Sequence, residues 1–130
     1  MYLRFVVADV DEDSHMRLGI FQAIAKLEDH GKLCPHEKSE SDFIEKWFEE
    51  NLLEPTRFTT SKPPYYRKQN TAISWFKDGA DEHIRHVRSL AAILENHGVS
   101  VEMLTTDRVG YVVYEDEFQI VAEPFTGERD

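Results

Sequence analysis

The stretch TAISWFKDGADEHIRHVRSLAAILENHGVSVEM, residues 71–103, decides the fold class. Apolar residues alternate over 71–77 as in a strand, and Asp78-Gly79 interrupts that pattern. Over 80–96 the apolar residues recur at helical spacing, and the following His97-Gly98 is typical of a helix end. Apolar alternation returns from Val99. This succession of strand, helix and strand predicts a domain in which helices pack on a sheet.

The flanking sequence extends this pattern in both directions. Alternation over 2–7 predicts an opening strand, and apolar spacing after Ser14 predicts a helix that ends near Gly31. A second helix is expected from Ser41 or Asp42, and a connection with three prolines fills 53–70. The stretch 109–123 predicts a hairpin that turns at Glu115-Asp116. The predicted order is β-α-α-β-α-β-β-β: one α+β domain over 1–130, with helices on one face of a mixed sheet.

The composition excludes several classes of protein. The chain has 130 residues, a formal net charge of −10 and one cysteine, Cys34. A strongly acidic chain is a poor general binder of duplex nucleic acid, because that affinity comes from Lys and Arg. No apolar run approaches the roughly 20 residues of a membrane span, and the start of the chain lacks the pattern of a signal peptide. These features predict a cytoplasmic protein without internal disulfides.

Four stretches carry a resemblance to known proteins. They are Tyr2–Val7, Gly19–Ala23, Ala72–Lys77 and Gly110–Glu117, and the helix end at 95–99 belongs with them. Over nearly its whole length, the chain resembles a family of small uncharacterised bacterial proteins. The resemblance implies a bacterial cytosolic domain. It implies no activity, substrate or catalytic residue.

The segment 57–70 is the basic exception in an acidic chain, with four Lys or Arg, three aromatic residues and no acid. Guanidinium and ammonium groups beside tyrosines can hold a phosphate and stack a base. The alternative is that these cations pair with acidic residues elsewhere on the same chain. We expect a binding or regulatory module that engages a protein partner or a small anionic ligand, with these candidate residues: Arg57, Lys62, Tyr65, Tyr66, Arg67 and Lys68.

A second hypothesis is a small enzyme that uses the carboxylates of Glu115–Glu117. Crowded carboxylates can raise one another's pKa and act as general acid or base. Folds that transfer ADP-ribose use an early arginine, a serine on a later strand and a late Glu-x-Glu, and Arg4, Ser74 and Glu115 with Glu117 fall in that order. The alternative is a solvated hairpin turn.

No metal, cofactor or established partner is predicted. Histidines and the cysteine lie close together at His30, Cys34 and His36 and at His83 and His86, but their spacing matches no zinc motif. The six glycines stand singly, so no phosphate-binding loop is present in the sequence. Because an open edge strand invites pairing, a homodimer through the terminal hairpin is a further expectation.

Overall fold

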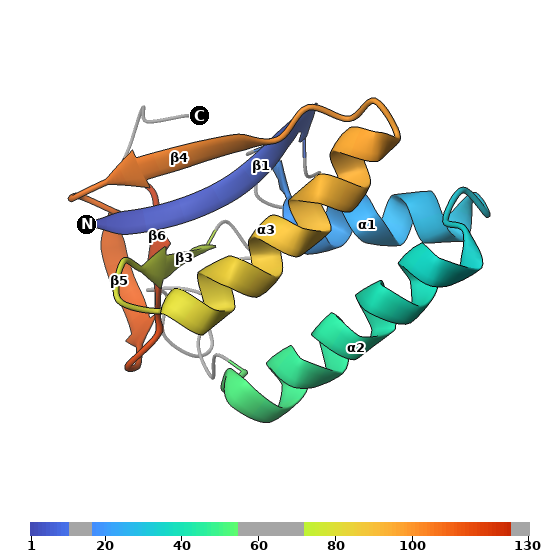
Figure 1. The fold of residues 1–130 in the computed structure, drawn as a ribbon. Coiled ribbons are helices and arrows are strands. Elements are labelled where there is room, and N and C mark those ends of the chain that lie inside the picture. The colour runs from blue at the N-terminus through green and yellow to red at the C-terminus, as the bar shows by residue number, and fades with distance from the viewer. Residues whose placement is uncertain (11–16, 55–71, 126–130) are drawn as a thin grey trace, which may run out of the picture.

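The computed structural model describes residues 1–10, 17–54 and 72–125. It is an α+β fold in which helices lie against a sheet (Figure 1). The elements in chain order are β1 (Tyr2–Val10), β2 (Arg17–Gly19), α1 (Ile20–Asp29), α2 (Pro35–Asn51), β3 (Ile73–Lys77), α3 (Asp81–Asn96), β4 (Glu102–Thr106), β5 (Tyr111–Glu115) and β6 (Gln119–Glu123). The predicted class and order are confirmed, with the short strand β2 as an addition.

The described strands are connected in the order β2-β1-β3-β6-β5, and β4, off this path, also pairs with β1. Because β3 and β4 both pair with Tyr2 and Leu3, they lie on opposite edges of β1. All of these pairings are antiparallel, so the sheet is not the mixed one that was predicted. The reason lies in the connection through α3. Strands β3 and β4 run in the same direction, but β1 lies between them and runs the opposite way. No parallel neighbours result.

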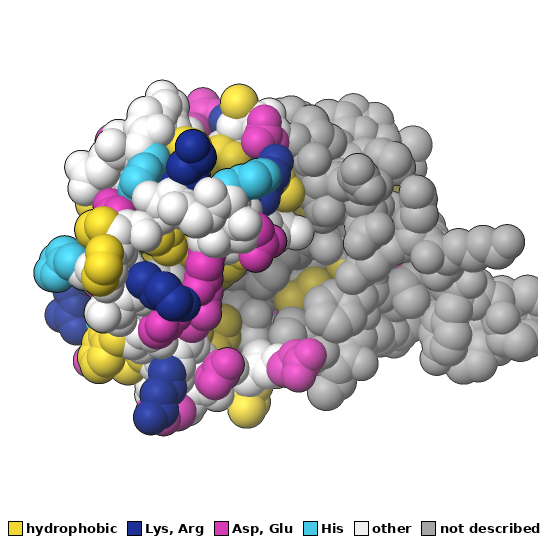
Figure 2. All heavy atoms as spheres, turned by 90° about the vertical axis from the view of Figure 1, so that its right-hand side faces the viewer, with side chains coloured by type: hydrophobic (Ala, Val, Ile, Leu, Met, Phe, Trp, Pro, Cys, Tyr) yellow, Lys and Arg dark blue, Asp and Glu magenta, His cyan; other side chains and the backbone are white. Residues whose placement is uncertain are grey.

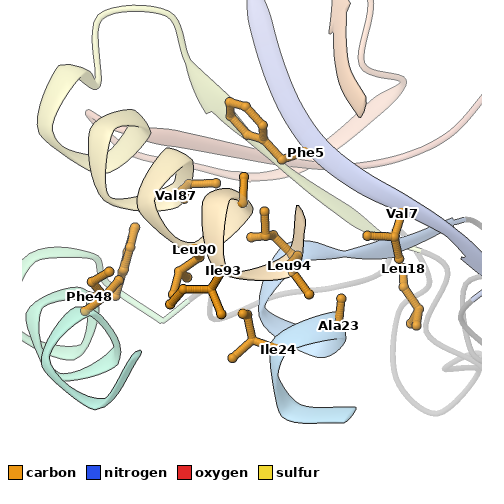
Figure 3. Packing of buried hydrophobic residues seen from close by; sticks show 13 residues of the cluster. Phe5, Val7, Leu18, Ala23, Ile24, Phe48, Val87, Leu90, Ile93 and Leu94 are labelled. Atoms are coloured by element: carbon orange, nitrogen blue, oxygen red, sulfur yellow. The ribbon is translucent and has the colours of Figure 1, made fainter. Parts of the chain in front are cut away.

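One face of the sheet carries the helices, as expected (Figure 1). Alternate residues of β1, Phe5 and Val7, point into a core with Val87, Leu90 and Leu94 of α3 (Figure 3). Side chains of α1, which contacts β1, β2 and α3, and of α2, which packs against α3, complete this core. On the opposite face a smaller cluster comes from Val109, Ile120 and Ala122, with Tyr2 and Trp75 packed against it.

The N-terminal helix begins later than its spacing predicts. Residues 17–19 form β2, and α1 begins only at Ile20. Tertiary contacts explain the difference: Leu18 is buried in the core, Gly19 pairs with Val6, and Arg17 Nε donates a hydrogen bond of 3.0 Å to the carbonyl of Val7. These contacts fix an extended backbone where local propensity also allows a helix.

The second helix begins earlier than predicted, at Pro35 instead of Ser41 or Asp42. Proline is well suited to the first helical position because it has no N–H to leave unsatisfied. Glu37 completes the start of the helix, since its Oε1 accepts the backbone N–H of Cys34 at 3.0 Å. Ser41 therefore lies inside α2, where it is buried.

The terminal hairpin is confirmed, with the turn between Glu115 of β5 and Gln119 of β6. Gly110 lets β5 begin close against the end of β6. Its φ is +121°, and a Cβ atom at this position would lie 2.1 Å from the carbonyl oxygen of Glu123. Only glycine fits there without moving the backbone.

In the part of the chain that the structure describes, no helix has the length and apolar character needed to cross a membrane.

Candidate functional site at the hairpin turn

The residues predicted to bind a ligand, Arg57, Lys62, Tyr65, Tyr66, Arg67 and Lys68, lie outside the described residues. The structure does describe the residues on either side of their segment. Leu53 precedes it and Ile73 follows it, and both contact the β5–β6 hairpin. The candidate site therefore comprises the contacts made at these two positions.

Gln119 lies at the centre of a set of polar contacts that we call the turn network, made by Ser74, Tyr114, Asp116 and Gln119. Its side chain is only 2% exposed. The Nε2 amide donates to the carbonyl of Leu53 at 2.6 Å and to Oδ2 of Asp116 at 3.0 Å, and Oε1 accepts the hydroxyl of Ser74 at 3.2 Å. Both ends of the buried amide are thus satisfied, which removes the main cost of burying it.

Asp116 holds the turn itself. Its Oδ1 accepts the backbone N–H groups of Phe118 and Gln119 at 2.9 and 3.1 Å, and its Oδ2 accepts the hydroxyl of Tyr114 at 2.8 Å. Partial burial has the largest single influence on the pKa of Asp116 and raises it. The hydrogen bonds from Phe118, Gln119 and Tyr114 outweigh it and hold the pKa below its ordinary value of 3.8. Asp116 is therefore an ionised acceptor that shapes the turn.

Tyr114 shows the reciprocal effect. Because its hydroxyl donates to the Asp116 carboxylate, and because burial and that negative charge act in the same direction, its pKa is raised above 10.0. A tyrosine held in this way remains a hydrogen-bond donor at neutral pH.

His83 of α3 connects the same region to the end of α2. The residue is 4% exposed, and its Nε2 lies 2.9 Å from the carbonyl of Asn51. Since a carbonyl only accepts, Nε2 carries the hydrogen. The imidazole stacks on Phe118 with 4.3 Å between ring centroids and meets Trp47 edge-on at 4.8 Å. The ring therefore joins α2, α3 and the hairpin turn.

These contacts place the two flanks of the basic segment beside one strand. Leu53 is bound to Gln119, and Ile73, which is buried, pairs with Ala122. Gln119 and Ala122 both belong to β6 and are three residues apart, which corresponds to about 10 Å along a strand. Leu53 before the segment and Ile73 after it are thus both held by β6, at neighbouring positions along that strand.

The structure does not bring the four residues of the enzyme hypothesis together. Arg4 is buried on the sheet face that carries Tyr2, where its guanidinium donates to the carbonyl of Arg17. Ser74 lies on the opposite face, which it shares with Phe76 and Gln119. Because neighbouring strand residues point to opposite faces, the sheet separates these two side chains.

The carboxylates of that hypothesis are also apart from Arg4. Glu115 accepts an ion pair from Lys77 at 2.6 Å, and Glu117 is exposed in the turn. Strands β3 and β6 lie between Arg4 on β1 and Glu115 on β5. Three strand spacings separate them, or about 14 Å.

No metal site was predicted, and the described residues contain no group of three or more His, Cys, Asp or Glu that could hold an ion. His83 uses Nε2 for the carbonyl of Asn51, and the His86 ring lies 4.4 Å from the Trp47 ring. His97 instead binds Glu37, with 2.8 Å between Nε2 and Oε1. The hydrogen bond with His97 lowers the pKa of Glu37 below 4.5, and the hydrogen bond from the backbone N–H of Cys34 is the second-largest cause of this shift.

The turn network was missed as a site at the sequence level. Gln119 binds a residue 66 positions away and Ser74 one 45 positions away, so no spacing rule could connect them. A local signal existed only for Asp116, since an aspartate that accepts N–H groups two and three residues later is common in turns.

Charge is distributed unevenly between the described part and the basic segment. The described residues include 10 Lys or Arg and 20 Asp or Glu, whereas 55–71 include four Lys or Arg and no acid. On the described part of the face shown in Figure 2, basic, acidic and histidine side chains are interspersed. Residues 55–71 thus form a basic stretch, without any Asp or Glu, in an acidic chain.

Comparison of the chain with protein-family models, with curated proteins and with solved structures found no match.

Proposed function

We propose that the protein is a cytoplasmic bacterial binding module that holds a small anionic ligand through residues 57–68. The observation that carries this proposal is the contrast between the positive charge of the basic segment and the negative charge of the rest of the chain. Residues 55–71 include four Lys or Arg and no acid, and they lie in the chain between Leu53 and Ile73, two residues that are fixed to β6 in an otherwise acidic domain.

The chemistry of the segment favours a phosphate-bearing ligand with an aromatic ring. Arg57, Arg67, Lys62 and Lys68 supply charge for a phosphate, and guanidinium groups bind its oxygens in pairs. Tyr65 and Tyr66 supply rings on which a base can stack. A mononucleotide combines both features.

The turn network supports this function by fixing Leu53, the residue just before the segment. Loops that bind ligands act best on a rigid scaffold, because less conformational freedom is lost on binding. Here the scaffold is polar and buried: Gln119 holds Leu53, and His83 holds Asn51.

The test is a calorimetric titration of the protein with adenosine monophosphate, in parallel with adenosine and with inorganic phosphate. We expect the mononucleotide to bind more tightly than either part alone. The double variant Arg67→Ala/Lys68→Ala should weaken this binding by about tenfold or more, and the binding should fall as salt is raised.

The matched control is Lys32→Ala/Lys46→Ala, which removes two exposed cations from the described part of the chain. It should leave the affinity within about twofold of the original. Equal losses in both double variants would contradict the proposal, because they would show a general effect of net charge. Absence of binding to all three probes would contradict it as well.

An acidic protein partner is the other form of the same proposal. If the wild-type chain retains a partner from a bacterial lysate and Arg67→Ala/Lys68→Ala does not, while the mononucleotide fails to bind, the segment recognises a protein and not a nucleotide.

A further inference from the structure

β5 is the last strand of the described sheet on the side of the hairpin. It pairs with β6 along one edge, and no other described strand pairs with it. Two consecutive residues of β5 are exposed although they are large and apolar: Tyr111 at 55% and Val112 at 50%. An edge strand presents unpaired backbone N–H and C=O groups, so this edge is suited to pairing with a further strand.

The protection that edge strands usually carry is weak here. Lysine, proline or inward-pointing charge commonly blocks such an edge, but residues 110–114 are uncharged and contain no proline. The protective features are the charged Glu115 at the end of the strand and an irregularity in the pairing with β6 between Val112 and Tyr114. At the other end of the sheet, β4 begins with Glu102, which forms an ion pair with Arg17.

The irregularity also determines which residues share a face. Tyr111 pairs with Glu123, and Tyr114 pairs with Val121. Glu123 and Val121 are two residues apart on β6 and point to the same face, so Tyr111 and Tyr114 also share a face. Residues opposite each other in an antiparallel pair lie on one face, which makes a pairing of Tyr111 with Tyr114 compatible with the sheet.

We propose that a second copy of this chain pairs with β5, antiparallel and around a two-fold axis between Val112 and Val113. Tyr111 of each copy then lies opposite Tyr114 of the other, and Val112 lies opposite Val113. The strand is complementary to itself in this register, as a two-fold interface requires. The two sheets become continuous across the interface.

The charges near the strand fit the same register. Glu115 lies opposite Gly110 of the other copy, and it is already neutralised by Lys77 of its own chain, so like charges do not oppose each other. The exposed Arg108 lies just before β5 and the exposed Glu117 lies in the turn just after it, so the Arg108 end of each copy comes beside the Glu117 turn of the other. The Arg108 guanidinium lies 4.9 Å from the Phe125 ring centroid, and that ring packs against Tyr111. Opposite charges therefore meet at both ends of the interface, which is the reason for choosing a second copy as the occupant.

Sedimentation velocity over a range of protein concentrations tests this pairing. A short strand pair buries little area, so we expect a weak dimer whose population increases with concentration. Val112→Lys places a charge on the edge and should leave only monomer. The matched control, Thr105→Lys on the exposed part of β4, should leave the dimer unchanged. Circular dichroism spectra of both variants verify that they fold.

A charge exchange tests the register. Arg108→Glu should weaken dimerisation by about tenfold, and the double variant Arg108→Glu/Glu117→Arg should restore it. Three results would overturn the proposal: a monomer at all concentrations, a dimer that survives Val112→Lys, or a double variant that dimerises no better than Arg108→Glu. None of these results bears on residues 57–68, so the ligand proposal stands or fails separately.

Discussion

The two ends of the sheet are held together by different kinds of contact. Around β1, the helix-covered end, the core is apolar, and α3 contributes buried Val87, Leu90 and Leu94 (Figure 3). At the β5–β6 hairpin the apolar cluster is small, and the turn network fixes the neighbouring chain through hydrogen bonds.

This difference separates stability from positioning. Apolar burial gives large free energies of unfolding without directional demands, because it depends on area. Hydrogen bonds contribute less in net terms but hold particular atoms in particular places. Leu53, which precedes the basic segment, is held in place by such a hydrogen bond, from Gln119.

The largest expected effect comes from the helix-covered end. Leu94 is fully buried in the core, so Leu94→Ala should lower the free energy of unfolding by about 3 kcal/mol through lost burial and a cavity. Urea unfolding followed by circular dichroism measures this loss. The control is Leu53→Ala, a side chain that is 69% exposed and should cost less than about 0.5 kcal/mol. Similar losses in the two variants would show that the core is not where the stability resides.

A smaller loss is expected at the hairpin. Gln119→Ala leaves the carbonyl of Leu53 and the hydroxyl of Ser74 without their partner, which should cost about 2 kcal/mol. Hydrogen exchange should show the additional opening at residues 51–54 and not in α1. As a control, Gln22→Ala removes an exposed glutamine whose Oε1 accepts the backbone N–H of Gly19 at the start of α1, so any opening that it causes should lie in α1 and not at 51–54. An opening spread evenly over the domain would contradict a positioning role for Gln119.

The smallest effect is a change with pH. The folded-state pKa of Asp116 is below its ordinary 3.8, so its contribution is fully present above that value and is lost as pH falls through the folded-state pKa. Asp116→Asn should therefore be destabilising by less than about 1 kcal/mol at neutral pH, and the difference from wild type should shrink in the acid range. Urea unfolding at several pH values between neutrality and strong acid measures this. The exposed Asp107→Asn serves as control; a pH dependence unchanged by Asp116→Asn would show that Asp116 has no such role.

The elements that the sequence predicted best are those whose signals are local. The helix expected over 80–96 is α3, Asp81–Asn96, because strong periodicity lies between a clear start and a clear glycine end. The hairpin turn was found for a similar reason. The start of α2 was missed although its signals, Pro35 and Glu37, are local too.

The remaining features depend on contacts between distant residues. The strand β2 exists because residues 17–19 meet β1, and the antiparallel sheet arises because β1 enters between β3 and β4. The turn network joins residues from β3, β5, the hairpin turn and β6 and reaches the carbonyl of Leu53 beyond the end of α2. A single Gln or Ser in a sequence does not indicate such a partner. The fold class was therefore within reach of the sequence, but the scaffold of the candidate site was not.

The central place of β1 has a consequence for synthesis of the chain. β1 pairs with β3 and β4, and the pairing of Tyr2 with Thr106 spans roughly one hundred residues, a separation that makes folding slow. At about 5–20 residues per second, a ribosome needs on the order of 5–20 s to make that stretch. During this interval the edge of β1 that β4 later occupies has no strand to pair with, although β2 and then β3 become available for the rest of the pairing. The β1 edge thus remains unpaired on the nascent chain until β4 emerges, and the sheet cannot be completed before then.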